Sequence, residues 1–404
     1  MRRRLTQRCI DGAPHNFQVL IDLWVFCSKC LTITELIVDE SGGSPPDPSD
    51  GRPVIVFNAT GGDDTQALQN FINGQGNNVI LDIHGVAGIG GQGVTIQSKI
   101  GVKITSTTGG GCKAISDGQY STPYSSMLYG NNLTECTFED LQLDGNGKNA
   151  QGLYLNQCVR SKMLRLHAWN IRHAASGPPY AALKADSSVD IEVGHCNVHD
   201  LSGAGGNGEG VRGIWLGVGG SFCVRPYIHD CLVVNPGHSG IVTESSAPRV
   251  VNNKVHEVVI DGTGYKFIAR GDPAEADYSD NYVESTANGG FMIEGSDVHP
   301  TKIYVRNWVA RDVGGMGTSF GMLYVSGSQG VRNVVGENWN LDGCMRIANF
   351  NYLFDSTFKD IVVNDGPPVS ALEHEVHNIQ FNNAGTVEIG SNVTQIWVDG
   401  KQVV

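Results

Sequence analysis

The chain repeats one pattern of apolar and polar positions from Gly152 onward. Each repeat begins with a small or permissive residue, continues as an alternating apolar strand and ends in a polar turn. Seven such segments follow one another: Gly152–Asn156, Ala182–Asp186, Gly213–Gly217, Gly240–Glu244, Lys266–Arg270, Gly290–Glu294 and Gly321–Val325. Their starts are 30, 31, 27, 26, 24 and 31 residues apart. A period of this size has room for short strands but for no long helix, so it predicts an all-β parallel β-helix.

A different pattern precedes the coils. The short strand Val54–Phe57 leads to Asp63 and Asp64, either of which can accept N–H bonds at the start of a helix. The apolar residues that follow fall on one helical face: Ala67, Leu68, Phe71 and Ile72. We therefore expect residues 54–85 to form an N-terminal cap, in which a short amphipathic helix covers the open end of the solenoid.

The run Gly62-Asp-Asp-Thr-Gln-Ala-Leu-Gln69, followed by coils, resembles the pectate-lyase-like superfamily of right-handed parallel β-helices, and within it the phage tailspikes. The resemblance covers residues 54–404 as architecture and carries no catalytic signature. It implies a homotrimer that binds, and as a hydrolase or lyase depolymerises, bacterial surface polysaccharide. Whether this chain is an enzyme stays open. The alternative is a non-catalytic receptor-binding or structural virion component on the same fold.

Residues 1–40 lie outside that resemblance and are separated from it by the Pro/Gly/Ser-rich linker 41–53. Four soft ligands occur there at Cys9, His15, Cys27 and Cys30. This set suits tetrahedral zinc, and a metal would stabilise a segment too short to build its own core. The alternative is a β-hairpin with incidental thiols. In a tail appendage, such an N-terminal module would attach the chain to the virion or to a larger assembly.

The seven other cysteines lie in or beside the coil strands, where we expect buried free thiols rather than disulfides. The formal net charge of −13 argues against a nucleic-acid partner, which needs a basic face. No stretch reaches the length of an apolar membrane span, and Asp22 interrupts the only apolar run near the N-terminus. We expect a virion tail or extracellular protein without a conventional signal peptide.

The register of the coils predicts which side chains face outward. Residues one and three after the leading residue should point into the coil, and residues two and four should point out. The second-position column reads Tyr154, Lys184, Trp215, Val242, Ile268, Met292 and Leu323. Its last four members form an apolar strip, which we expect to be buried between the subunits of a trimer.

The fourth-position column holds the candidate acids. Glu244 and Glu294 are two coils apart, or about 9.6 Å, at the upper end of the spacing of the two carboxylates in inverting glycosidases. Arg270 lies between them and Asp272 follows, so we consider the three acids as catalytic candidates and Arg270 as a ligand for a sugar acid. The alternative is a surface ladder in which Arg270 neutralises two glutamates.

A second outward column contains Trp169, His199, His229 and His256, each histidine being followed by an acid. These side chains could bind a metal or substrate, or form a solvated ladder. Trp169, Trp215 and Tyr154 are the candidates for stacking on sugar rings.

Overall fold

The computed structural model describes residues 50–404 except 118–125, 174–179, 204–209, 218–220, 259–261, 272–273, 297, 299, 315–320, 327–329, 345, 365–368, 373–375, 383–385 and 390–392. Before residue 50 it describes the backbone of three strands, which pair antiparallel in the order β1 (Phe17–Ile21), β2 (Trp24–Cys27) and β3 (Ile33–Glu35). Cys9, His15 and Cys30 lie outside the described residues, as does the side chain of Cys27. The zinc site therefore stays a prediction.

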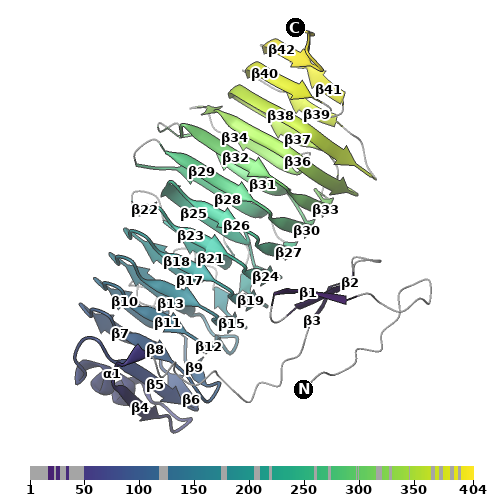
Figure 1. Cartoon of the computed structure of the whole chain (residues 1–404). Coiled ribbons are helices and arrows are strands. Elements are labelled where there is room, and N and C mark those ends of the chain that lie inside the picture. The colour runs from purple at the N-terminus through teal and green to yellow at the C-terminus, as the bar shows by residue number, and fades with distance from the viewer. Residues whose placement is uncertain are drawn as a thin grey trace, which may run out of the picture.

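The rest of the chain is a parallel β-helix, as the repeat predicts (Figure 1). One face is a 13-stranded sheet, to which each coil contributes one strand, except that β21 and β22 come from the same coil and both pair with β25. Its strands are β7 (Val94–Gln97), β10 (Ser126–Asn131), β13 (Gln151–Asn156), β17 (Ala181–Asp186), β21 (Arg212–Leu216), β22 (Cys223–Val224), β25 (Ile241–Ser246), β28 (Thr263–Ala269), β31 (Gly289–Glu294), β34 (Leu323–Ser326), β37 (Ala348–Phe350), β39 (Val369–Leu372) and β41 (Thr386–Ile389).

The rest of each coil belongs to a 25-stranded sheet, usually as two short strands joined at a corner. Its first half contains β4 (Val54–Asn58), β5 (Ile80–His84), β6 (Val86–Ile89), β8 (Lys103–Thr105), β9 (Gly111–Ala114), β11 (Thr137–Glu139), β12 (Gln142–Asp144), β14 (Lys162–Leu164), β15 (His167–Trp169), β18 (Glu192–Gly194), β19 (Asn197–His199), β23 (Tyr227–His229) and β24 (Leu232–Val234). The second half contains β26 (Arg249–Val251), β27 (Lys254–Val258), β29 (Glu275–Ser279), β30 (Tyr282–Thr286), β32 (Lys302–Arg306), β33 (Val309–Val313), β35 (Val331–Arg332), β36 (Val334–Asp342), β38 (Leu353–Val363), β40 (Val376–Asn382), β42 (Val393–Val398) and β43 (Lys401–Gln402). A separate pair joins β16 (Arg172–His173) to β20 (Ser202–Gly203).

The corners between the two short strands require left-handed backbone. Equivalent corner residues of successive coils have φ of 55° at His195, 53° at Asp230, 56° at Asn252, 60° at Asp280 and 57° at Asn307. Asn, Asp and His are the non-glycine residues that tolerate this region best, which explains why they recur at the period of the coil.

The predicted inward positions form the core. Leu153, Leu155, Ile214 and Leu216 are fully buried, and farther along the coil the ring of Phe291 stacks on that of Trp308 at 5.4 Å. The seven described cysteines are free and buried, as predicted: Cys112, Cys136, Cys158, Cys196, Cys223, Cys231 and Cys344. Burial raises the pKa of the Cys158 thiol to about 12.

The predicted helix is α1 (Thr65–Asn73), at the N-terminal end of the solenoid. Asp63 Oδ1 accepts the Thr65 N–H at 3.1 Å, while the Asp64 carboxylate accepts the N–H of Thr60. Leu68 and Ile72 are buried as expected. Ala67 was also assigned to the apolar face, but it is exposed because the contact surface of a nine-residue helix is narrow. No helix in the described part of the chain has the length and apolar character that a membrane span requires.

The structure corrects the predicted register of two coils. Val242 pairs with Lys266, and Glu244 with Ile268, because the repeat equivalent to Gly240 begins at Gly264 rather than at Lys266. The alternation Tyr265, Phe267, Ala269 fits either start, so periodicity alone could not separate them.

The second shift is at Gly321, where Phe291 pairs with Leu323. Leu323 is consequently fully buried in the coil, and Tyr324 faces outward instead of inward. Together with Lys266 between Val242 and Met292, these shifts remove the apolar strip, so the strip gives no support to a trimer interface.

Candidate functional site

Two neighbouring columns of side chains line the outer face of the 13-stranded sheet. The first is Tyr129, Tyr154, Lys184, Trp215, Val242, Lys266, Met292 and Tyr324. The second contains Asn131, Asn156 and Asp186, and farther along Glu244, Ile268, Glu294 and Ser326. We use the name charged face for the ionisable members together with Arg270: Lys184, Asp186, Glu244, Lys266, Arg270 and Glu294.

The N-terminal part of the charged face is a buried network around Lys184. Its Nζ lies 3.3 Å from Asp186 Oδ2, 4.6 Å above the ring of Tyr154 and 5.1 Å from that of Trp215. The Tyr154 hydroxyl donates to Asp186 Oδ2 at 2.7 Å. Each of these residues is at most 8% exposed, so the ammonium group is held by one carboxylate and two aromatic faces.

Asp186 is the most perturbed acid of this face. Burial raises its pKa above the ordinary value, and this effect exceeds the opposing effects of Lys184 and of the Tyr154 hydrogen bond. The negative charge of Glu244 raises it further. Its second oxygen, Oδ1, has no hydrogen-bond partner among the described residues. This oxygen is buried, so a proton on it would reach a bound molecule only after the neighbouring side chains moved.

The C-terminal part is more open and consists of two ion pairs. Lys266 Nζ lies 2.6 Å from Glu294 Oε2, and an Arg270 guanidinium nitrogen lies 3.4 Å from Glu244 Oε2. Glu294 and Arg270 have side chains 36% exposed, whereas that of Glu244 is only 10% exposed. A bound molecule can therefore reach Lys266, Arg270 and Glu294 from solvent.

The structure places the predicted acids partly as expected. Glu244 and Glu294 share one column two coils apart, since both pair with Ile268. Arg270 does not lie between them: it follows Ile268 by two residues and reaches back to Glu244. Asp272 lies outside the described residues.

The two predicted sugar-stacking rings on this face are covered. Trp215 is 3% and Tyr154 5% exposed. The guanidinium of Arg212 lies 4.1 Å over the Trp215 ring, and Lys184 occupies the space between the two rings. In this conformation the rings hold cations, and a sugar could stack on Trp215 only after Arg212 moved.

The histidine column lies on the 25-stranded sheet and differs from the prediction. Trp169, His199 and His256 share a column, but the residue between His199 and His256 is Val234 instead of the predicted His229. His229 pairs instead with Gly194 and Val251, in the column of the preceding short strand. The error arises because each coil places two short strands on this sheet, so a spacing near 30 residues fits either strand.

The side chains of that column contact one another rather than a cleft. His167 Nε2 lies 2.7 Å from His199 Nε2, and Trp169 stacks on His199 with ring centres 6.2 Å apart. Burial, together with His199, lowers the pKa of His167 to about 4. His256 is paired with Glu284 at 3.0 Å.

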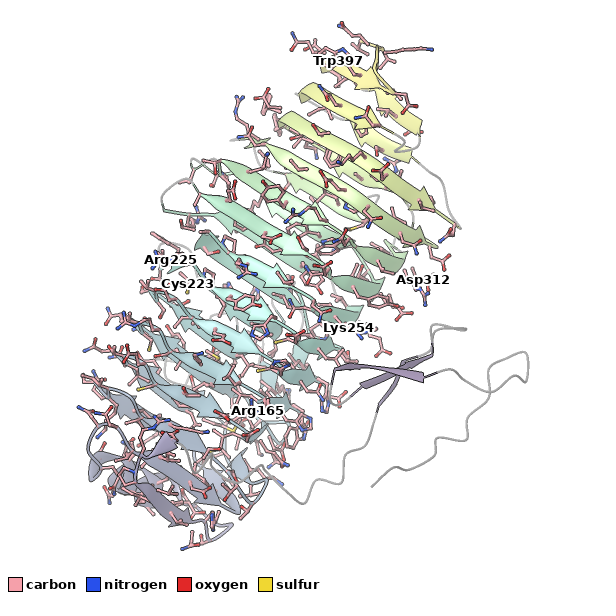
Figure 2. All side chains as sticks on the ribbon, viewed as in Figure 1. Arg165, Cys223, Arg225, Lys254, Asp312 and Trp397 are labelled. Carbon is pink, nitrogen blue, oxygen red and sulfur yellow. The ribbon has the colours of Figure 1, made fainter. Side chains whose placement is uncertain are left out.

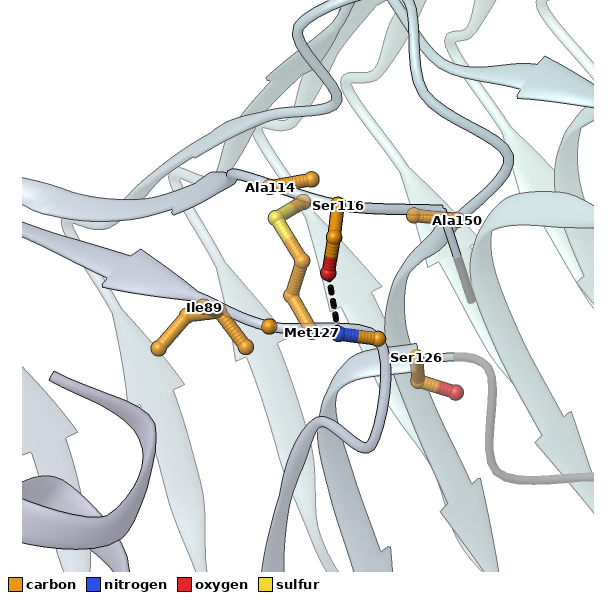
Figure 3. Close-up of a pocket in the computed structure, with 8 residues that line it drawn as sticks. Ile89, Ala114, Ser116, Ser126, Met127 and Ala150 are labelled. Atoms are coloured by element: carbon orange, nitrogen blue, oxygen red, sulfur yellow. Dashed lines mark hydrogen bonds between the residues drawn. The ribbon is translucent and has the colours of Figure 1, made fainter. Parts of the chain in front are cut away.

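The small cavity in Figure 3 lies between coils near the N-terminal end and is lined mainly by apolar side chains such as Ile89 and Met127. Ser116 accepts a hydrogen bond from the Gly91 N–H at its edge. The cavity has room for about one water molecule, so it cannot be a substrate site.

Sequence reasoning missed Lys184, Asp186 and Lys266 as members of the site. The signal was present for the first two, because Lys184 and Asp186 stand in adjacent outward positions of one segment, as an i, i+2 pair on the same face. Lys266 is not recognised as an outward residue, because the repeat pattern places it at the first position of a segment.

Comparison with family models and with curated proteins found no match in sequence. Comparison with solved structures did find the same fold. A family 28 exopolygalacturonase of Yersinia enterocolitica superposes with a TM-score of 0.54 at 9% identity, over 94% of this chain and 83% of the other. A hyperthermoactive exopolygalacturonase of Thermotoga maritima gives 0.50 at 12% identity, over 90% and 94%. A tailspike protein of Escherichia coli bacteriophage HK620, solved with a hexasaccharide, gives 0.49 at 11%, over 92% and 80%. The likeness to the two exopolygalacturonases establishes the fold alone, a right-handed parallel β-helix.

Proposed function

We propose that this chain is a tailspike-like protein that binds bacterial surface polysaccharide along the charged face. The observation that carries the proposal is the set of cations and carboxylates on the outer face of the 13-stranded sheet, from Lys184 and Asp186 to Glu294, with Trp215 between them on β21. This set extends over strands β17, β21, β25, β28 and β31, and four strand spacings amount to about 19 Å. An extended polymer would contact Lys266, Arg270 and Glu294 directly, and would reach the buried Lys184, Asp186 and Glu244 only after the side chains that cover them moved.

The chemistry of the face suits a carbohydrate. Sugar hydroxyls donate to carboxylates and accept from ammonium and guanidinium groups, and Lys266, Arg270 and Glu294 offer both kinds of partner within reach of solvent. Lys266 and Arg270 would also favour sugars that carry a carboxylate. The two exopolygalacturonases support the proposal at the level of the fold alone.

A second candidate function is hydrolysis of the bound polysaccharide, and the raised pKa of Asp186 favours it. Because Asp186 is buried, the side chains that cover it would first have to move, and Asp186 would then donate its proton to the glycosidic oxygen as the bond to the anomeric carbon breaks. Glu244, as the carboxylate, would take a proton from the water that attacks that carbon from the opposite side. The backbones of these two residues are two strands apart, or about 9.6 Å, which is at the upper end of the carboxyl spacing in inverting enzymes.

The predicted pair of Glu244 and Glu294 has the same spacing and remains the other assignment. Glu294 is held by Lys266 and is partly exposed, which suits a base better than an acid. Glu294→Gln should therefore slow cleavage only if Glu244 and Glu294, rather than Asp186 and Glu244, are the catalytic pair.

The test is incubation of the full chain with a panel of capsular and O-antigen polysaccharides. Binding is measured by calorimetry, and cleavage by new reducing ends or by an unsaturated chromophore, which separates hydrolysis from elimination. Lys266→Met and Arg270→Met should weaken binding about 10-fold or more, at about 1.4 kcal/mol per tenfold. Asp186→Asn and Glu244→Gln should stop cleavage and keep binding.

The matched control is Glu337→Gln, which breaks the 3.2 Å pair with Lys359 on the opposite sheet. If the control weakens binding as much as Lys266→Met does, the charged face is the wrong surface. If a bound glycan is never cleaved, hydrolysis is rejected and the binding function stands.

The assembly that the resemblance implies belongs to the same proposal. A homotrimer on the virion tail, docked through residues 1–40, would present three charged faces to the cell surface. Light scattering of the full chain at micromolar concentration should give three times the monomer mass, and a monomer would reject this part. A zinc content that falls by one equivalent per chain in Cys27→Ser with Cys30→Ser would support the metal module.

A further inference from the structure

One corner of the 25-stranded sheet brings together two imidazoles and a carboxylate. His195 follows β18, while in the next coil His229 ends β23 and Asp230 follows it. His195 and Asp230 are equivalent left-handed corner residues, with φ of 55° and 53°, and the His195 N–H donates to the His229 carbonyl at 3.1 Å. Parallel stacking therefore places the imidazole of one coil next to the His-Asp pair of the following coil.

The ligand atoms are close enough to share one ion. His229 Nδ1 lies 2.7 Å and His195 Nε2 3.9 Å from Asp230 Oδ2, and one ligand atom from each of the three residues falls within 4.8 Å of the others. Two ligands at about 2.0–2.1 Å from a tetrahedral zinc ion are about 3.3 Å apart, a value between these two distances. Small rotations of the half-exposed His195 would complete the geometry.

We propose that His195, His229 and Asp230 form a binding site for a divalent first-row transition metal such as zinc. Two imidazoles and one carboxylate are ligands that zinc, nickel and iron(II) accept, and three protein ligands leave a coordination position open. The ion would link two successive coils at their corner. The site is separate from the predicted N-terminal zinc module and from the charged face, which lies on the other sheet.

The surroundings of the three ligands support this assignment. His229 Nε2 lies 3.2 Å from Glu192 Oε1, and Glu192 is itself held by Lys162 at 2.7 Å. The side chain of Asn252 donates to the other oxygen of Asp230. Metal-binding histidines and carboxylates typically have such outer hydrogen bonds, which fix the orientation of the ligand atom.

The hydrogen bonds of His229 give a specific reason for a cation. A neutral imidazole donates from one nitrogen only, and both nitrogens of His229 face carboxylates. If Nε2 donates to Glu192, then Nδ1 presents a lone pair to Asp230 Oδ2, and a cation bound to both atoms would turn that repulsion into coordination. The alternative is a hydrogen-bonded cluster of His229, Glu192 and Asp230 without any metal.

The chain contains an internal comparison for this site. His199-Asp200 repeats the same dipeptide, with Nδ1 2.8 Å from the carboxylate. There, however, His167 approaches the opposite nitrogen, Nε2, so the second imidazole does not face the carboxylate. In the described part of the chain, three such ligand atoms converge at Asp230 and not at Asp200.

The test uses the full chain with Cys9, Cys27 and Cys30 changed to serine, so that thiolates cannot bind the metal. After removal of metals with a chelator, Co²⁺ is titrated and followed by its visible absorption and by elemental analysis. We expect one equivalent at micromolar concentration, displaced by Zn²⁺. His195→Asn and Asp230→Asn should abolish this binding and still fold, because asparagine tolerates the left-handed corner.

Two further variants make the assignment sharp. Glu192→Gln should weaken Co²⁺ binding about 10–100-fold, as expected for a residue that orients a ligand. Asp200→Asn should leave it unchanged. If the parent chain binds no Co²⁺, the metal site is rejected and the hydrogen-bonded cluster without metal stands. Equal loss in Asp200→Asn and Asp230→Asn would also reject it.

Discussion

The variant Asp186→Asn tests whether Asp186 stabilises the fold as the partner of Lys184 or has a functional role as an acid. The carboxylate lies beside the Lys184 ammonium and accepts the Tyr154 hydroxyl, and its side chain is 7% exposed. If it were mainly the structural partner of Lys184, neutralising it would leave a buried cation unpaired, at a cost of about 3–5 kcal/mol. The network would then be a structural ion pair.

The raised pKa of Asp186 predicts the opposite result. Because burial outweighs both favourable partners, the ionised carboxylate is less stable in the folded chain than in the unfolded chain. Asparagine has nearly the same shape and can still accept from Tyr154. We therefore expect Asp186→Asn to change the free energy of unfolding at pH 7 by between zero and about 1 kcal/mol, toward higher stability.

The pH dependence follows from the sign of the shift. Above the raised pKa, Asp186 is ionised in both states, so the wild type carries the full cost of the buried charge. As the pH falls toward the ordinary value of 3.8, the folded state takes up its proton first and this cost disappears. The advantage of the variant over the wild type should therefore shrink between neutral pH and about pH 4.

Urea unfolding of both chains between pH 4 and pH 8 measures this difference. Asp190→Asn is a matched control, since Asp190 forms an exposed pair with Arg225 and should show little effect (Arg225 is labelled in Figure 2). A loss of 3 kcal/mol or more in Asp186→Asn at pH 7 would refute the reasoning and, with it, the role of Asp186 as an acid.

Three further predictions concern stability and reactivity. Burial lowers the pKa of Lys254, which is labelled in Figure 2. Lys254→Met should therefore raise the free energy of unfolding at pH 7 by about 1 kcal/mol, and this gain should disappear as the pH rises toward 10.5. A variant that is no more stable than the wild type at pH 7 would contradict this prediction. Asn253 accepts the Cys231 N–H and donates to Asn281 inside the coil. Asn253→Ala should therefore lower the free energy of unfolding, measured with urea, by about 3 kcal/mol. A decrease of less than about 1 kcal/mol would show that these hydrogen bonds do not stabilise the coil. Burial raises the pKa of Cys158 to about 12, and the other six core thiols are also buried. A thiol reagent at pH 8 should therefore modify at most three of the ten cysteines before denaturation. A fourth reactive thiol would contradict the packing of the core.

The fold could be predicted from the sequence because every coil repeats the same alternation of inward and outward residues. Alternation fixed the inward side chains of most segments, and the cap was predicted by one short run around Asp63. Register was harder. In β28, alternation extends over Thr263–Ala269, so the strand has two equivalent starts by hydrophobicity, and only the pairing of Val242 with Lys266 decides between them.

The candidate site was predicted in outline and missed in detail for a related reason. A column of outward residues follows from the period, so Glu244 and Glu294 were placed correctly. Which members interact depends on side-chain reach across coils, as when Arg270 reaches back to Glu244. Burial of outward residues such as Asp186 also cannot be inferred from alternation, which assigns them to solvent.

The placement of charges on the two sheets indicates which surface has a function beyond folding. At corners of the coil, pairs such as Arg160 with Glu135 have both side chains more than half exposed, and such pairs add little to stability. On the 13-stranded sheet, the chain buries Lys184 and Asp186 to about nine-tenths, although apolar side chains of similar volume would cost less. A fold with a core this long does not need that arrangement for stability. Costly buried charges that converge on one face are a feature of binding and catalytic sites, and this supports the charged face as a candidate site.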